Sequence, residues 1–147
     1  MSSPKFENVS PERSRLMARV KGKDTKPELL VRRALHALGY RFRLHRRELP
    51  GRPDIVLPRY RTAIFIHGCF WHRHPECSKA SMPKTRVDFW REKFETNIDR
   101  DGRNIAALRE LGWQVLVVWE CETKQIEELT LRLAAALGRR EHADGES

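Results

Sequence analysis

The chain has 147 residues, 39% of them hydrophobic, and its 29 Lys and Arg outnumber its 20 Asp and Glu to give a net charge of +9. This length predicts one domain with a single core, and the apolar content excludes a wholly disordered chain. No apolar run approaches the roughly 20 residues of a membrane span, and the first residues lack the apolar stretch of a secretory signal. We therefore expect a soluble, intracellular protein.

The positive charge is concentrated in the first part of the chain. Residues 1–60 contain 15 Lys and Arg against 6 Asp and Glu, whereas residues 61–147 contain 14 of each. A basic segment of this kind is typical of a protein that binds a polyanion, with nucleic acid as the first candidate. An acidic membrane is the second candidate, but no amphipathic helix is long enough to support it. A basic surface that only confers solubility is the remaining alternative.

The N-terminal third predicts a basic arm followed by a capped helix. Residues 1–24 form the arm, which includes a short helix from Ser10 to about Val20. Thr25 to Glu28 match a capping box that opens a longer helix, which Gly39 ends. The alternation of apolar and basic residues over 40–44 indicates an exposed strand.

The middle of the chain predicts two strands and a long helix. The strands cover residues 54–57 and 62–67, and an irregular segment, residues 68–86, precedes a helix over 87–111. The apolar positions of this helix predict an inner side made of Trp90, Phe94, Ile98, Ile105 and Leu108.

The last third predicts a strand and a helix that complete one layered domain. Residues 113–119 are a nearly continuous apolar run, which indicates a strand buried on both faces. Thr123 can cap the final helix, and residues 139–147 read as a disordered tail. We expect an α/β layered domain over residues 25–138, with a mixed β-sheet flanked by helices.

Asp54 is the first candidate for chemistry. It follows a Pro-Gly-Arg-Pro turn and begins a hydrophobic strand, so its carboxylate is expected at the rim of the sheet. A carboxylate there can bind a hard cation such as Mg²⁺, although a solvated acid at a turn is the simpler alternative. The next strand ends in His67, which brings imidazole close to the same rim.

The irregular segment contains a candidate zinc site. Cys69, His74 and Cys77 are spaced so that one loop can place them around a zinc ion, and Cys121 can complete a tetrahedron. This set accounts for all 3 cysteines. His72 competes with His74 for the ligand position, so the choice between them stays open at this point.

Phe70 and Trp71 are adjacent aromatic residues in the same segment. Two consecutive aromatic side chains in an irregular segment do not easily both point into a core. An exposed aromatic ring beside a basic surface can wedge between base pairs and unstack them.

Three blocks of the sequence resemble the very short patch repair (Vsr) family of DNA mismatch endonucleases. The blocks are LPGRPDIVLPRYRTAIFIHGCFWHRH, TRVDFWREKFETNIDRD and LGWQVLVVWEC, and the match runs in order from about Ser14 to Leu133. The resemblance implies a restriction-endonuclease-like core with a structural zinc site. It also implies an enzyme that nicks one DNA strand 5′ to the T of a T:G mismatch, the lesion left when 5-methylcytosine deaminates.

The resemblance implies a role for individual residues. Asp54 would be the central Mg²⁺ ligand, and His67 and His72 would hold metal-bound waters, with His72 activating the attacking one. Glu28 would add a carboxylate, although its capping-box position is a purely structural alternative. Zinc would be held by Cys69, His74, Cys77 and Cys121.

The resemblance also implies which residues would contact DNA. These are an aromatic wedge of Phe70, Trp71 and Trp90, then Met17 from the opposite groove, and Arg52. For Trp90 and Met17, a place on the core face of a helix is the alternative.

The sequence departs from the family pattern near the metal ligands. Ile66 stands where the best-known pattern has Thr, so a Mg²⁺ contact there would use the backbone carbonyl. The spacing from His74 to Cys77 is one residue longer. The Glu and Lys of the general endonuclease signature do not follow Asp54, so His67 stands where a carboxylate is expected.

The implied partner is double-stranded DNA with a T:G mismatch, followed by downstream mismatch-repair proteins. We expect a monomer, because a single-strand nick needs only one active site. We also expect it in the bacterial cytoplasm, associated with the nucleoid. A less specific or restriction-type endonuclease of the same fold is one alternative. A zinc-stabilised DNA-binding module without catalysis is another, and the presence of Asp54, His67 and His72 argues against it.

Overall fold

The computed structural model describes residues 25–146, with side chains described to residue 138. The predicted arm with its short helix and Met17 lie outside the described residues, so the division into arm, domain and tail stays a prediction. The helices are α2 (Lys26–Ala37), α3 (Val87–Glu110) and α4 (Ile126–Glu146), and the strands are β1 (Arg43–Leu44), β2 (Ile55–Leu57), β3 (Thr62–His67) and β4 (Gln114–Trp119). Short 3₁₀ helices cover Pro58–Tyr60, Ser78–Ala80 and Glu120–Lys124.

The strands form a mixed four-stranded sheet in the order β1-β2-β3-β4. β1 and β3 both pair with β2 in antiparallel fashion, and β3 pairs with β4 in parallel. A parallel pair needs a crossover connection, and here α3 provides it. This confirms the mixed α/β architecture with a sheet flanked by helices.

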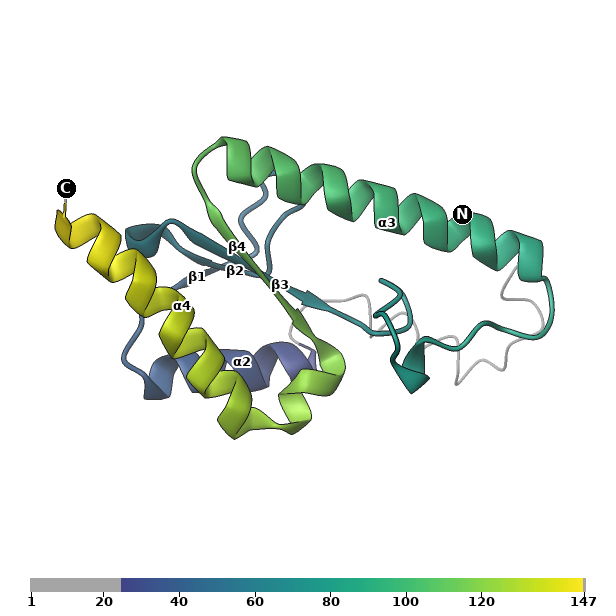
Figure 1. The fold of residues 1–147 in the computed structure, drawn as a ribbon, viewed down its shortest axis with the longest axis horizontal. Coiled ribbons are helices and arrows are strands. Elements are labelled where there is room, and N and C mark those ends of the chain that lie inside the picture. Colours follow the sequence, from purple (N-terminus) through teal and green to yellow (C-terminus); the bar gives the residue numbers. More distant parts are fainter. Residues whose placement is uncertain (1–24, 147) are drawn as a thin grey trace.

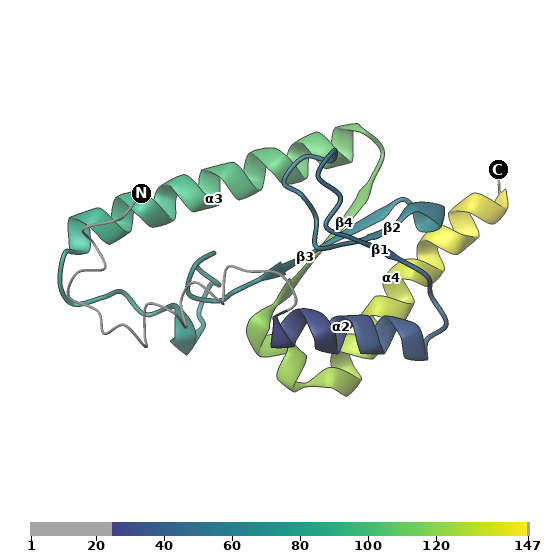
Figure 2. The same cartoon turned by 180° about the vertical axis from the view of Figure 1, so that it is seen from behind.

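Helices cover both faces of the sheet, with α2 and α4 on one face and α3 on the other (Figures 1 and 2). Side chains alternate along β3, so Ile64 faces the α2 and α4 side, whereas Ala63 and Phe65 face α3. The larger core lies on the first side and contains Val31, Ala34, Leu35, Ile55, Leu57, Tyr60, Ile64, Val118, Leu129, Leu133 and Leu137.

Helix α3 extends beyond the sheet at its N-terminal end, as Figure 1 shows. Its C-terminal half packs on the sheet through Leu108. Its N-terminal half carries Trp90 and Phe94, which pack with Trp71 in a separate aromatic cluster. One helix therefore joins the sheet to the irregular segment before it.

Several expectations for individual positions are wrong. Ile98 is 49% exposed, and Asn97 takes the inward position because its Nδ2 donates to the carbonyl of Trp71. β4 is only partly buried apart from Val118, because it lies at the edge of the sheet. Thr123 does not cap α4; it lies in the preceding 3₁₀ helix, where its hydroxyl donates to the carbonyl of Glu120.

Other differences concern the limits of elements. The strand expected over residues 40–44 is reduced to Arg43–Leu44. The backbone of α4 continues as helix to Glu146, across most of the segment that the sequence marks as a tail. None of the described helices is long and apolar enough to cross a membrane.

The turn before β2 predicts a stability difference between two glycines. Gly51 has φ +77°, and a Cβ there would lie 2.9 Å from Cβ of Asn104 and 3.0 Å from the Phe65 ring. Gly39 has φ +87° with no atom within 4 Å of the same position. Gly39→Ala should lower the free energy of unfolding by about 1 kcal/mol through backbone strain alone. Gly51→Ala should lower it by a further ~1–3 kcal/mol through overpacking. Equal losses in urea unfolding would contradict this packing of α3.

Candidate functional site

The candidate residues gather at one end of the sheet because of how β3 pairs. Antiparallel pairing places the start of β2 beside the end of β3, and parallel pairing places the end of β4 there as well. Asp54 precedes β2, His67 ends β3, and Cys121 follows β4. The topology therefore brings the predicted Mg²⁺ and zinc ligands to the same edge.

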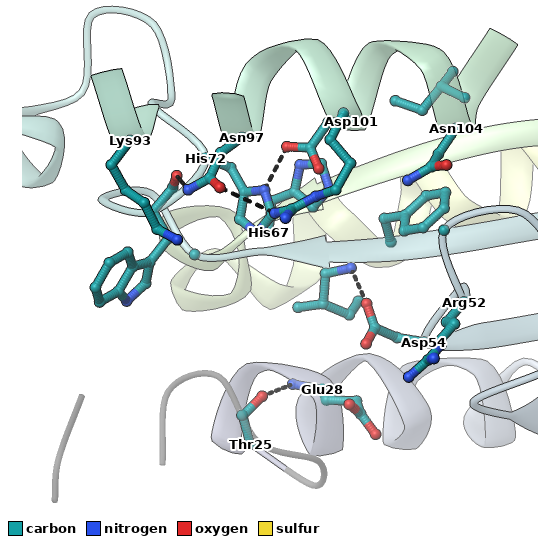
Figure 3. A pocket seen from close by; sticks show the side chains of 17 residues that line it. Thr25, Glu28, Arg52, Asp54, His67, His72, Lys93, Asn97, Asp101 and Asn104 are labelled. Carbon is teal, nitrogen blue, oxygen red and sulfur yellow. Dashed lines mark hydrogen bonds and ion pairs between the residues drawn. The ribbon is translucent and has the colours of Figure 1, made fainter. Parts of the chain in front are cut away.

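A cavity of about 640 Å³ opens at this edge, between α2 and α3 (Figure 3). Three of its lining side chains are carboxylates, and three are Lys or Arg. The charged lining residues are Glu28, Asp54, Asp101, Arg52, Lys93 and Arg100, and His67 and His72 also line it. The wall of the cavity also contains Ile66, Trp71, Asn97 and Asn104.

Asp54 is held at the cavity by the neighbouring strand. Its Oδ2 accepts a hydrogen bond from the backbone N–H of Ile66 at 2.7 Å. Burial raises the pKa of Asp54 above its ordinary value, and this hydrogen bond and the charges of His45, His72 and Arg32 oppose the rise. Within the described part of the chain, Glu28 and Asp101 have ion-pair partners and Asp54 has none. The carboxylate that has no ion-pair partner among the described residues therefore lies where Mg²⁺ was predicted.

Glu28 does more than cap a helix. Its backbone N–H donates to Thr25 Oγ1 at 3.4 Å, which is one half of the predicted capping box. Its side chain is 2% exposed and pairs with Arg32 and His45 instead of the cap backbone. Ligand atoms of Glu28, His45 and Asp54 all lie within 4.8 Å of one another. The structure thus brings Glu28 to Asp54.

His67 and His72 stack on each other across the cavity wall. Their ring centroids are 3.9 Å apart and the planes differ by 6°. Nδ1 of His72 lies 2.6 Å from Oδ2 of Asp101 on α3. Burial and the proximity of His72 lower the pKa of His67 to about 4. Burial raises the pKa of Asp101, but the hydrogen bond and charge of His72 outweigh it, so the net shift is downward.

The second cluster contains Cys69, His74, Cys77 and Cys121, with donor atoms all within 4.8 Å of one another. Nδ1 of His74 lies 3.6 Å from Cys69 Sγ and 3.4 Å from Cys121 Sγ. Tetrahedral zinc with its usual bond lengths separates a sulfur from a nitrogen ligand by about 3.5 Å. The donor set and its spacing therefore fit Zn²⁺, and the structure places His74, not His72, in this cluster.

The predicted wedge residues pack together against α3. Trp71 and Trp90 are 7% and 8% exposed, whereas Phe70 is partly exposed and contacts both rings edge-on. Arg73 fastens the segment to the helix: its guanidinium lies 4.1 Å from the Phe94 ring centroid and donates to the carbonyl of Phe70. Of the three predicted wedge residues, Phe70 is thus the one that is partly exposed.

Sequence reasoning missed Asp101 and His45. A signal for Asp101 existed, because it lies seven residues from both Phe94 and Leu108 and therefore on the inner side of α3. An acid on that apolar stripe indicates a buried partner. His45 had no comparable signal, because its contact with Glu28 joins segments 17 residues apart. Arg52, which was predicted to bind DNA, is exposed at the cavity with φ +50°.

The lowered pKa of His67 predicts how stability depends on pH. An unfolded histidine titrates near pH 6.5, so between about pH 6.5 and 4 the unfolded chain binds a proton that folded His67 does not. The contribution of His67 to stability should therefore fall as pH falls through this window. NMR titration of the imidazole without added Mg²⁺ should show a neutral ring at pH 5.5. A midpoint near 6.5 would contradict the burial of His67.

The cysteine cluster predicts one zinc ion per chain by mass spectrometry of the purified protein. Cys121→Ser should lower the zinc content and reduce Tm by about 5 °C or more, because a structural metal contributes directly to folding. Asp54→Asn should leave zinc content unchanged, since Asp54 belongs to the other cluster. A wild-type protein that is free of zinc and equally stable would refute the site.

Comparison with known proteins agrees with the resemblance noted in the sequence. The model of the family described as DNA mismatch endonuclease Vsr matches residues 8–79. The type II nicking enzyme V.XorIIP of Xanthomonas oryzae pv. oryzae is 52% identical over 128 residues, covering 86% of this chain and 93% of the relative. The DNA mismatch endonuclease Vsr of Escherichia coli K12 is 47% identical over 118 residues, covering 80% and 75%. The chain therefore belongs to the Vsr family of DNA mismatch endonucleases.

Proposed function

We propose that this protein nicks one DNA strand 5′ to the T of a T:G mismatch, in a reaction that requires Mg²⁺. The observation that carries the proposal is the convergence of Asp54, His67 and His72 on one cavity. They come from the start of one strand, the end of the next and the loop that follows. Family membership supports the endonuclease activity, and the cavity suggests how each group takes part.

His72 is the group that takes the proton from the attacking water. Because Nδ1 faces the Asp101 carboxylate at 2.6 Å, Nδ1 carries the shared proton and Nε2 is left as the acceptor. The stacked ring of His67 stays neutral at neutral pH, so it does not repel the imidazolium that His72 becomes. Asp101 stabilises that imidazolium, as a buried acid does for a catalytic histidine.

The donor set around Asp54 fits a hard cation, because carboxylate and backbone carbonyl oxygens are the ligands that Mg²⁺ prefers. Asp54 and Glu28 would hold it, with the carbonyl of Ile66 as a further oxygen at the same wall. When bound, Mg²⁺ neutralises charge on the phosphate and on the leaving 3′-oxygen. His67 Nδ1 is buried and has no hydrogen-bond partner among the described residues, so it is a donor or acceptor available to metal-bound water.

Selectivity for the mismatch rests on how easily the T:G base pair is deformed. A T:G wobble pair distorts more easily than a matched pair, so inserting a ring beside it costs less free energy. Phe70 is a partly exposed ring, and it is supported by buried Trp71 in the same segment and by buried Trp90 on α3. Met17 would enter from the opposite groove, and Arg52 at the cavity would contact the backbone.

The remaining features belong to the same proposal. The sheet and its helices form a restriction-endonuclease-like core, stabilised by Zn²⁺ at the four-ligand cluster. Residues 1–24 act as a basic arm on DNA, and the protein works as a monomer in the bacterial cytoplasm, close to the nucleoid and its repair proteins.

Nicking of end-labelled duplexes tests the proposal. Wild-type protein with Mg²⁺ should cut a T:G duplex 5′ to the T, leave the matched C:G duplex intact, and cut neither with EDTA. Asp54→Asn keeps the acceptor for Ile66 but loses the charge, and should slow nicking by more than about 100-fold, beyond the loss typical of an outer metal partner.

Asp88→Asn is the matched control, because Asp88 is a fully exposed acid on α3. It should nick at the wild-type rate. Equal cutting of matched and mismatched duplexes would instead support a less specific endonuclease. Binding without any cutting would support a DNA-binding module and overturn the proposal.

A further inference from the structure

His45 lies beside the candidate active site without belonging to the predicted catalytic set. Its Nε2 is 3.0 Å from Oε2 of Glu28 and 3.2 Å from Oε1. Its side chain is 19% exposed, so the contact is largely shielded from water. The ring is not among the side chains that line the cavity, but its ligand atom lies within 4.8 Å of ligand atoms of both Glu28 and Asp54.

The backbone of His45 is fixed to the other carboxylate. Strand β1 ends at Leu44, paired with Ile55, and His45 then adopts φ +49°. Its N–H donates to the carbonyl of Asp54 at 3.1 Å. A histidine in the left-handed region is uncommon, and such conformations persist where surrounding contacts determine them. One residue therefore contacts the main chain of Asp54 and the side chain of Glu28.

Glu28 needs a partner from outside its own helix. A carboxylate that is 2% exposed is costly unless it is paired and hydrogen-bonded. Arg32 supplies one partner, but it lies one turn along the same helix and moves with Glu28. In the described part of the chain, His45 is the side chain that ties this carboxylate to the sheet. The spacing between the carboxylates of α2 and β2 therefore depends on His45.

We propose that His45 is a positioning residue that holds Glu28 at the Mg²⁺ site of Asp54. This inference rests on the proposed function, because Glu28 matters to nicking only if it helps to hold the cation. A cation bound directly by His45 fits the structure less well. The ring faces a carboxylate that already pairs with the Arg32 guanidinium, and it is not among the side chains that line the cavity.

A double-mutant cycle on zinc-loaded, full-length protein tests the inference. The variants are Glu28→Gln, His45→Leu and the two combined, and the readouts are the single-turnover nicking rate at saturating T:G duplex and the Kd for DNA. His45→Leu should slow nicking by about 10–100-fold, as expected for a residue that orients a metal ligand, while the Kd changes by less than about twofold. The double variant should be no slower than Glu28→Gln, because both changes remove one function.

Rescue and control variants separate positioning from a general structural role. His45→Gln retains an N–H donor on a neutral side chain and should recover most of the wild-type rate. His36→Leu removes an exposed histidine that contacts Phe42 in the same region, and should leave the rate unchanged. Zinc content and the urea midpoint check that each variant is folded.

Mn²⁺ binding, measured by electron paramagnetic resonance of the free ion, gives a readout that does not need nicking. His45→Leu should weaken Mn²⁺ binding by roughly the factor by which it slows nicking, and His45→Gln should restore it. Additive losses in the cycle, a His45→Leu rate within twofold of wild type, or no rescue by Gln would overturn the inference. A wild-type protein that binds Mn²⁺ but does not nick T:G duplex would overturn the proposed function instead, and the Mn²⁺ data would still test His45.

Discussion

The pairing of β3 with two neighbours of opposite direction is the constraint on which the site depends. Its antiparallel partner β2 begins where β3 ends, and its parallel partner β4 ends there too. At this point the backbone N–H of Ile66 donates a hydrogen bond to the Asp54 carboxylate, which adds a side-chain contact to the pairing of β2 with β3. A one-residue slip in either register would move Asp54 or His67 to the opposite face of the sheet.

Helix α3 forms one wall of the cavity at this edge of the sheet. Parallel pairing of β3 and β4 requires a crossover, and the crossover helix is longer than the sheet it covers. Its sheet-bound half carries Asp101 to His72, and its projecting half carries the aromatic cluster. Asn97 lies between the two and donates to the carbonyl of Trp71. Helix α3 thus contacts the histidine pair, the aromatic cluster with Phe70 and the sheet, and connects the three.

The parts of the site that sequence could predict are those set by local pattern. Asp54 and His67 flank apolar strands, and their placement at the rim follows from strand direction alone. The cysteine spacing likewise indicated the cluster of Cys69, His74, Cys77 and Cys121. Glu28 was ambiguous, because Thr25 and Glu28 satisfy a capping box whether or not the side chain folds back. Its actual partners depend on α2 packing beside β1, which no local pattern encodes.

The long helix illustrates the same limit. Its apolar stripe was read correctly at Phe94 and Leu108, yet Ile98 is exposed and Asn97 is buried. A polar side chain took the inward position because the carbonyl of Trp71, in the irregular segment, accepts a hydrogen bond from it. The hydrogen-bonding needs of a distant segment decided this position, and hydrophobic periodicity does not report them.

The charges of the cavity connect metal binding with DNA binding. Two of its three carboxylates have close partners among the described residues: Glu28 pairs with Arg32, and Asp101 lies 2.6 Å from Nδ1 of His72. Asp54 has no ion-pair partner among the described residues, and burial raises its pKa above the ordinary value. A phosphodiester entering between Arg52, Lys93 and Arg100 would also approach the Asp54 carboxylate. A divalent cation held by Asp54 would offset the repulsion between that carboxylate and the phosphate. The cation that we propose for the reaction would thus also favour the approach of the DNA backbone.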